Sequence, residues 1–263
     1  MVGIIAFSIF AVYNFHNCMR KIKSIAFTSL LFGMLSTTVN AQKNVDTQHL
    51  IWTRYYLKLK LNDKYQIRQE IEERAYWFPW RQHQFVSRTY AERKLGNGWN
   101  TGLGFTYFLQ SLPHDPEISD YANQLELRPQ LEMAFKQSIS RKLILHHRYW
   151  SEFRFFEQPN GSYEFGNNRT RYRLEIRYTP IPKVTLKAFD EIHMNIGGKI
   201  VLNVFDQNRY GASVQYMPIE NFGFELGYFN WYQQRKSGVD FYNRHIIRFT
   251  LHHTIDFKIS KNQ

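Results

Sequence analysis

The sequence predicts an all-β fold: a transmembrane, antiparallel, up-and-down β-barrel that follows a cleaved signal peptide. Three observations predict it. Apolar and polar residues alternate with a period of two from about residue 47 to 257, which is the pattern of strands with one apolar face. The predicted turns alternate between short and long, and aromatic residues gather near both ends of the apolar faces. No segment after residue 41 shows the 3.6-residue period of a helix.

The first 41 residues form the predicted N-terminal signal region, and the barrel domain covers 42–263. From Met19 the chain has a basic segment, an apolar segment at 25–35 and the small residue Ala41. This is the pattern of a signal peptide over 19–41, cleaved after Ala41. Its apolar segment has 11 residues, whereas a membrane-spanning helix needs about 20. Residues 1–18 are also apolar, so an upstream mis-assigned start, with Met19 as the true one, remains an alternative.

Charge and cysteine content narrow the class of protein further. The chain of 263 residues has a net charge of +12 and 17% aromatic residues. Removing residues 1–41 takes three of the 34 basic residues and none of the 22 acidic ones, so the mature chain carries +9. Basic chains often bind nucleic acid, but a signal peptide argues against that partner. Cys18 is removed as well, which leaves neither a disulfide nor a thiol nucleophile.

Four strands are predicted between residues 51 and 107. The first alternates apolar and polar residues over 51–60, and a turn at 62–64 leads to the second, whose polar face carries arginine and glutamate. The third covers about 83–95 and has a weak apolar face. The sequence Gly96-Asn97-Gly98 then predicts a tight hairpin, and the fourth strand begins at Trp99.

The middle strands alternate most clearly. The fifth, about 125–136, contains Pro129, which cannot donate a ladder hydrogen bond; the alternation is in phase on both sides of it, so we expect a local irregularity. The sixth covers about 143–154. The seventh contains "RTRYRLEIRY" at 169–178, in which every second residue is charged. A charge on the lipid side near the midplane costs roughly 2–4 kcal/mol, so these charges are expected to face the lumen.

Four further strands are predicted at about 183–195, 208–216, 222–230 and 243–257, which makes eleven. Single-chain bacterial barrels have even strand numbers. We therefore expect about twelve strands, with a missing one around 42–50, or ten as the alternative. Gln69, Glu73 and Asp190 fall on the predicted lipid face and require rim positions or bulges.

Connection lengths and aromatic residues define two different ends. Short connections fall at 62–64, 96–98, 138–141, 180–182 and 217–221, and longer ones at 111–122, 156–166, 196–206 and 234–242. Only 79–82 breaks the alternation. The apolar faces carry aromatic residues next to the short turns (Tyr65, Trp99, Phe135, Tyr178, Tyr216, Phe222) and near the other ends (Trp77, Phe85, Tyr107, Phe155, Tyr228). Two aromatic rings around an aliphatic band are typical of the two interfaces of a bilayer.

The polar faces predict a charged network in the lumen, because long side chains on neighbouring strands can pair. The candidate residues are Arg68, Glu70, Glu72, Arg74, Glu126, Arg128, Glu132, Arg148, Glu152, Arg154, Arg169, Arg171, Arg173, Glu175, Arg177, Glu191, Arg209, Glu225, Arg244 and Arg248. Such side chains would fill a barrel of this size and leave no broad channel. The arginine excess favours a small polar or anionic solute as partner, besides outer-membrane lipid.

No catalytic, cofactor-binding or metal-binding residues are predicted. The adjacent pairs His146-His147 and His252-His253 point to opposite faces of a strand and cannot share a metal. His147 and Ser151 lie about 13 Å apart along their strand, too far for a nucleophile and its base. His193, with Glu191 and Asn195, is expected to form a hydrogen-bond cluster at the rim and not a metal site.

Several segments identify the chain as similar to a known family. "HRYWSEFRFF" (147–156), "NRTRYRLEIRYTP" (168–180), the acidic pair of "FDEIHMN" (189–195) and "FDQNRYGASVQY" (205–216) resemble segments of domain-of-unknown-function family 2490. The resemblance covers about residues 45–257. It implies a barrel in the outer membrane of a Gram-negative bacterium and supplies no activity or catalytic residues.

The expected function is therefore a non-enzymatic, porin-like outer-membrane barrel, either structural or a narrow conduit or binder for a small polar or anionic solute. The alternative is a lipid-modifying enzyme of the phospholipase or deacylase type, since barrels of this size can carry serine and histidine on the lipid face. The sequence indicates no oligomeric state.

Overall fold

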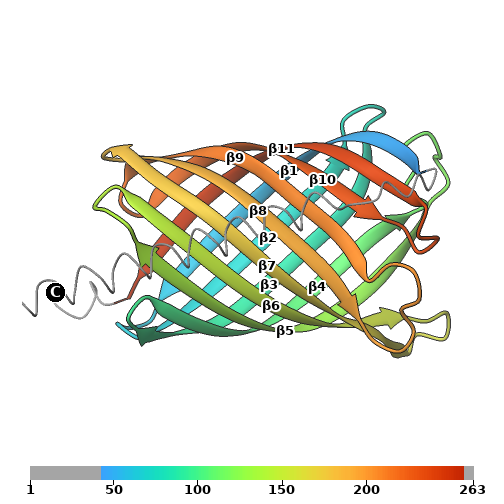
Figure 1. The fold of residues 1–263 in the computed structure, drawn as a ribbon, viewed down its shortest axis with the longest axis horizontal. Coiled ribbons are helices and arrows are strands. Elements are labelled where there is room, and N and C mark those ends of the chain that lie inside the picture. The colour runs from blue at the N-terminus through green and yellow to red at the C-terminus, as the bar shows by residue number, and fades with distance from the viewer. Residues whose placement is uncertain (1–42, 258–263) are drawn as a thin grey trace, which may run out of the picture. The chain divides into compact units, whose positions relative to one another are not determined.

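A computed structural model describes residues 43–257, and the predicted signal peptide lies outside this range. The described chain forms eleven strands (Figure 1). Their bounds are β1 Asn44–Lys60, β2 Tyr65–Tyr76, β3 Arg81–Gly96, β4 Trp99–Leu112, β5 Ala122–Ser138, β6 Leu143–Glu157, β7 Tyr163–Ile181, β8 Val184–Ile196, β9 Phe205–Ile219, β10 Phe222–Gln234 and β11 Asp240–Asp256. Among these residues no helix is long and apolar enough to cross a bilayer.

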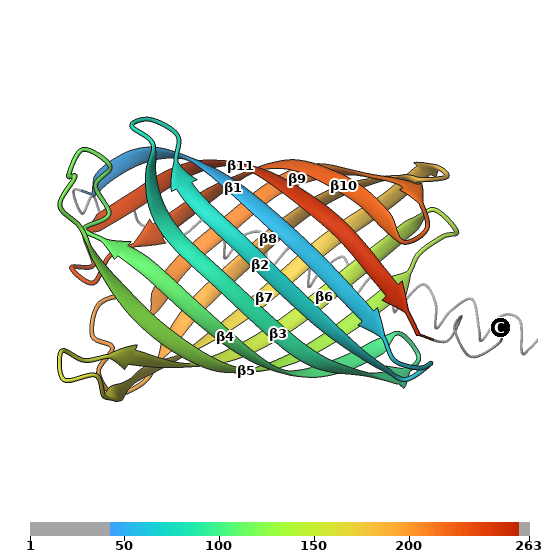
Figure 2. The same cartoon turned by 180° about the vertical axis from the view of Figure 1, so that it is seen from behind.

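The strands form one closed barrel in which each strand pairs with its neighbours in sequence, and β1 pairs with β11. All neighbours are antiparallel except β1 and β11, which run parallel from Asn44 beside Asp240 to Lys60 beside Asp256. Figure 2 shows these two strands side by side. The parallel seam closes the sheet with an odd number of strands. The expected twelve strands, and the alternative ten, are therefore wrong for the described chain: residues 44–50 are the first part of β1.

The two ends of the barrel differ as predicted. At the short-turn end, the connections are 61–64, 97–98, 139–142, 182–183 and 220–221; at the long-loop end they are 77–80, 113–121, 158–162, 197–204 and 235–239. Asn97 and Gly98 both have positive φ, 49° and 83°, as the predicted tight hairpin requires. β1 and β11 are parallel. Both strands therefore begin at the long-loop end and end at the short-turn end.

The outer face of the barrel carries the apolar sets predicted from alternation. Exposed outer residues include Leu103 at 67% and Leu226 at 60%, as well as aromatics near both ends such as Tyr178 and Trp77. Pro129 produces the expected local irregularity, since the β5–β6 ladder skips from Leu127 to Gln130 without a change of register.

The three polar side chains expected to need rim positions or bulges, those of Gln69, Glu73 and Asp190, have hydrogen-bond partners on the outer face. The β2–β3 ladder has a bulge after Arg74, next to Glu73, and the Glu73 carboxylate accepts a hydrogen bond from Gln82 at 3.0 Å. Gln69 bonds to Ser87 at 3.1 Å. The expectation of a rim position or bulge is wrong for Asp190, which lies inside the regular part of β8. The side-chain amide of Asn208 donates a hydrogen bond to the Asp190 carboxylate at 3.1 Å, which partly offsets the cost of this charge on the outer face.

Candidate binding site in the barrel lumen

The structure places all twenty predicted lumen residues on the inner face of the barrel. Fifteen of them are buried: Arg68, Glu70, Glu72, Arg74, Glu126, Arg128, Glu132, Glu152, Arg169, Arg171, Glu175, Glu191, Glu225, Arg244 and Arg248. The other five are half-buried: Arg148, Arg154, Arg173, Arg177 and Arg209. The inward orientation follows from the period of two, because alternate side chains of one strand point to one face of the sheet.

Ion pairs across strands fill the β5–β9 side of the lumen. Glu126 accepts hydrogen bonds from Arg128 (2.7 Å) and from Arg154 (2.5 Å). Glu152 pairs with Arg171 and, at 2.6 Å, with Arg169. Since each carboxylate lies between two guanidinium groups, the buried charge is compensated on this side.

A second network lies against β2 and β3. Arg68 Nη2 donates to Glu132 at 2.6 Å, and Arg88 Nη1 donates to Glu70 at 3.1 Å. Arg74 bonds to the neighbouring Glu72 on its own strand face at 2.7 Å. These contacts join β2, β3 and β5 through side chains as well as through the sheet.

An apolar plug fills the lumen toward the long-loop end. It consists of Leu50, Trp52, Tyr76, Phe189, Phe229, Trp231 and Ile246. Leu50 and Ile246 are completely inaccessible, and so are the polar His83, Gln207 and Arg244 beside them. This plug was not predicted from the sequence. Its signal was present, since large apolar residues stand at charged-face positions on β1, β10 and β11.

The β4–β5 connection, 113–121, packs onto the plug. Arg81 donates hydrogen bonds to the carbonyls of Asp115, Ile118 (2.8 Å) and Pro113 (2.5 Å). Gln48 donates to the carbonyl of His114 at 2.8 Å, and the His114 ring lies 5.0 Å from that of His83. Burial, reinforced by nearby Arg244 and Arg81, lowers the pKa of His114 to about 3. This histidine is therefore neutral at physiological pH.

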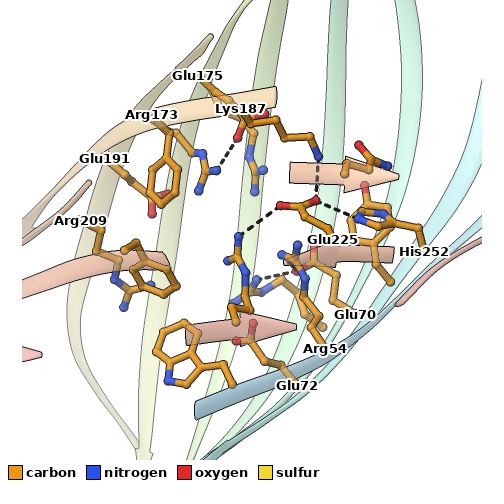
Figure 3. Close-up of a pocket in the computed structure, with 18 of the residues that line it drawn as sticks. Arg54, Glu70, Glu72, Arg173, Glu175, Lys187, Glu191, Arg209, Glu225 and His252 are labelled. Atoms are coloured by element: carbon orange, nitrogen blue, oxygen red, sulfur yellow. Dashed lines mark hydrogen bonds and ion pairs between the residues drawn. The ribbon is translucent and has the colours of Figure 1, made fainter. Parts of the chain in front are cut away.

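The other half of the lumen contains a cavity of about 190 Å³, which we call the lumen cavity. It extends from Trp52 and Phe229 at the plug to Lys58 and Arg177 near the short-turn end. Figure 3 shows Arg54, Glu70 and Glu72 on one side of it and Arg173, Glu191 and Arg209 on the other. Its lining includes eleven arginines and lysines but only five glutamates, a net charge of +6.

Glu225 is the main acceptor on one wall of the lumen cavity. It accepts hydrogen bonds from Lys187 (2.7 Å) and His252 (2.9 Å) (Figure 3). It accepts another from Ser213 at 2.8 Å. Arg248 approaches the same carboxylate only to 3.8 Å. A single carboxylate thus serves two cations and a histidine, which leaves the wall cationic.

Histidines on the outer face contact tyrosines. The hydroxyl groups of Tyr55, Tyr172 and Tyr228 lie 2.8, 2.9 and 2.6 Å from ring nitrogens of His253, His147 and His245. No hydrogen bond between a serine and a histidine is found within residues 43–257.

The His193 cluster lies near the long-loop end of β8, three residues before the strand ends at Ile196. His193 is completely buried, and its ring contacts Glu191 at 3.2 Å and Gln207 at 2.7 Å. The β8–β9 connection lies beside the cluster, since the Asn203 carbonyl accepts a hydrogen bond from Asn195 at 3.0 Å. In the part of the chain described, no group of His, Cys, Asp and Glu could hold a metal ion.

Fold and lumen define this chain as a closed eleven-stranded β-barrel with an apolar exterior and an ionic interior. More particularly, it belongs to the family described as protein of unknown function (DUF2490), whose model matches residues 50–243. The resemblance drawn from the sequence is thereby confirmed.

One solved structure is similar, the NanC porin in a rhombohedral crystal form. It has a TM-score of 0.48 and 11% sequence identity, and the match covers 78% of this chain and 97% of that chain. A similarity at this level carries no argument about function. A search of curated proteins found no significant match.

Proposed function

We propose that this protein is an outer-membrane barrel whose lumen binds a small anionic solute without transforming it. Three features support a location in the outer membrane: the signal-peptide pattern, the apolar outer face of the barrel and the closure of the sheet. In hydrocarbon every backbone amide needs a partner inside the protein, and a closed barrel provides one for each. The aromatic residues near both ends match the two interfaces of a bilayer.

The observation that carries the binding function is the net charge of +6 on the lining of the lumen cavity. Two of these cations, Arg148 and Arg171, have carboxylate partners just outside the lining, Glu132 and Glu152. For the others burial is costly where desolvation is not offset by Coulomb attraction. An anion in the cavity would remove this cost. Cavity walls of low dielectric also strengthen the attraction for such an anion over that in water.

Binding is favoured over conduction because the apolar plug closes the lumen beyond the cavity. Its members project from β1, β2, β8, β10 and β11, so no single loop movement would remove them. The structural version of the hypothesis, in which the lumen only fills the barrel, does not account for the cation excess.

Isothermal titration of the purified barrel in detergent tests the proposal, with sodium sulfate and sodium phosphate as probes and choline as a cationic control. We expect saturable binding of one anion per barrel and no binding of choline. In planar bilayers the barrel should give no conductance above that of lipid. Absence of anion binding would remove the proposed function, and a steady ion current would contradict the closed lumen.

A further inference from the structure

We infer that the lumen cavity is a one-ended site for a compact oxyanion with at least two negative charges, which enters from the short-turn end. This inference rests on the proposed anion-binding function and specifies its ligand and its route. Two independent observations carry the ligand: the hydrogen-bonding groups without partners and the placement of the guanidinium groups. The route rests on the apolar plug and on the basic residues of the short-turn end.

Hydrogen-bond donors outnumber acceptors among the groups without partners that line the cavity. Trp52 Nε1, Trp150 Nε1, Arg148 Nε, Arg171 Nε and Arg209 Nε have no hydrogen-bond partner within the described chain, against a single acceptor atom of Glu191. Buried polar groups are normally satisfied. A surplus of donors requires an occupant rich in acceptors, and an oxyanion has three or four oxygen atoms that accept.

Guanidinium groups collect on two indole rings of the lining. Arg74 and Arg209 lie 3.7 and 5.5 Å from the ring of Trp52. The ring of Trp150 is approached by three more, Arg148 (3.6 Å), Arg171 (4.8 Å) and Arg88 (5.7 Å). Stacking holds the planar groups in place, so a ligand meets donors that are already ordered.

Arg209 differs from these neighbours because it has no carboxylate partner within 4 Å in the described residues, although Glu191 lies opposite it in the β8–β9 register. Its guanidinium group lies 5.5 Å from the ring of Trp52 and 4.4 Å from the ring of Trp231. Arg209 is thus the lining guanidinium best able to bind an added anion at the inner end of the cavity.

The mouth of the cavity is basic. Lys58 on β1 and Lys136 on β5 lie on the inner face, each two residues before its strand ends at the short turns. The short turns add four basic residues, Lys64, Arg141, Lys142 and Lys183, against the acidic Asp63 and Glu220. Such a mouth attracts anions and accelerates their association.

The opposite end has no such excess of basic residues, since its connections carry Lys199, Arg235 and Lys236 against three acidic residues. The connection that packs on the plug, 113–121, carries Asp115, Glu117 and Asp120 and no arginine or lysine. Beyond it the lumen residues are buried. An anion therefore approaches the cavity from the short-turn end, because the plug and the packed connection cover the cavity on the other side.

Cavity size and charge limit the ligand. A volume of about 190 Å³ corresponds to roughly six water molecules at about 30 Å³ each. Phosphate and pyrophosphate fit this space, whereas an extended polyanion does not. A net lining charge of +6 favours a dianion or trianion over a monovalent ion.

Titration calorimetry and stopped-flow association on the full-length protein in detergent test the inference, with chloride, phosphate and pyrophosphate as probes. Affinity should rise in that order. Arg209→Gln should weaken pyrophosphate binding by roughly tenfold or more, as expected for one charged hydrogen bond. Lys136→Glu should slow association and reduce its salt dependence, while Asp115→Asn at the other end should leave the association rate unchanged.

Arg93→Gln is the matched control for Arg209→Gln, since Arg93 is an arginine on the outer face of β3. Heat-modifiable electrophoretic migration and circular dichroism establish that each variant folds, and Arg248→Gln replaces Arg209→Gln if the latter does not. Failure of every anion to bind would defeat the proposed function itself. Binding that ignores anion charge, or that survives Arg209→Gln and Lys136→Glu unchanged, would overturn only this inference.

Discussion

Lys60 Nζ lies 3.0 Å from a carboxylate oxygen of Asp256, so the last residue of β1 and the last residue of β11 form an ion pair at the same end of the barrel. This pair is possible only because the two strands run parallel. It marks the seam at which an odd number of strands closes.

The seam makes a prediction about chain topology. In a Cys18→Ser background, the double variant Ile51→Cys with Ile247→Cys should form a disulfide on oxidation, because the two residues are register neighbours on the outer face. Non-reducing electrophoresis reveals the cross-link as altered migration. The pair Ile51→Cys with Leu103→Cys, which joins β1 to the distant β4, is the control. Absence of the seam cross-link would indicate another strand between β1 and β11.

Glu126 should be essential for stability. Its carboxylate is completely buried and bound by Arg128 and Arg154, so Glu126→Gln leaves two guanidinium groups without their counter-charge. We expect a loss of about 3–5 kcal/mol in the free energy of unfolding, measured by urea titration in lipid. Glu164→Gln, which breaks the exposed pair with Lys199, should have no measurable effect. Equal stability of both variants would refute the buried network.

The apolar plug should contribute through packing. Leu50→Ala removes a completely buried side chain and should cost about 2–5 kcal/mol. On the outer face, Leu103 is 67% exposed, and Leu103→Ala should cost less under the same urea titration. If the two substitutions were equivalent, Leu50 would not lie in a packed interior.

Acid should loosen the 113–121 connection. The pKa of His114 is about 3 when this connection is packed and 6.5 in its reference state. Above pH 6.5 both states are neutral, and between 6.5 and about 3 only the opened state takes up the proton. The packed state therefore loses up to about 1.4 kcal/mol per pH unit across this range.

Hydrogen exchange of residues 113–121, compared at pH 7 and pH 5 after correction for intrinsic rates, measures this loss. Protection should fall at pH 5, and His114→Gln should abolish the pH dependence. The connection 158–162, which contains no histidine, is the internal control. Constant protection across the pH range would show that His114 is not buried as described.

Much of the architecture could be predicted because the alternation of polar and apolar residues in a β-strand is visible within that one segment of sequence. The period of two in "RTRYRLEIRY" assigns Arg171 and Arg173 to one face whatever the neighbouring strands are. Glycine and asparagine at 96–98 predict their turn for the same reason, since the positive φ values are a property of those residues.

Other features depend on pairs of residues that are distant in the sequence. The predicted number of strands was wrong because nothing in β1 alone indicates that its partner is the parallel β11. Asp190 was expected at a rim or bulge because a carboxylate falls there on the lipid face. The expectation was wrong because its hydrogen-bond partner, Asn208, lies on the next strand.

The sequence by itself determined the strands, their two faces and the unequal ends, since each depends on residues within one segment. Only the tertiary structure decided where the barrel closes, that Leu50, Trp231 and Ile246 meet in a plug, and that Arg209 is left without a carboxylate. The physical reason is that closure and charge compensation are set by distances between strands. Alternation along one strand fixes which way a side chain points but not which side chains it meets.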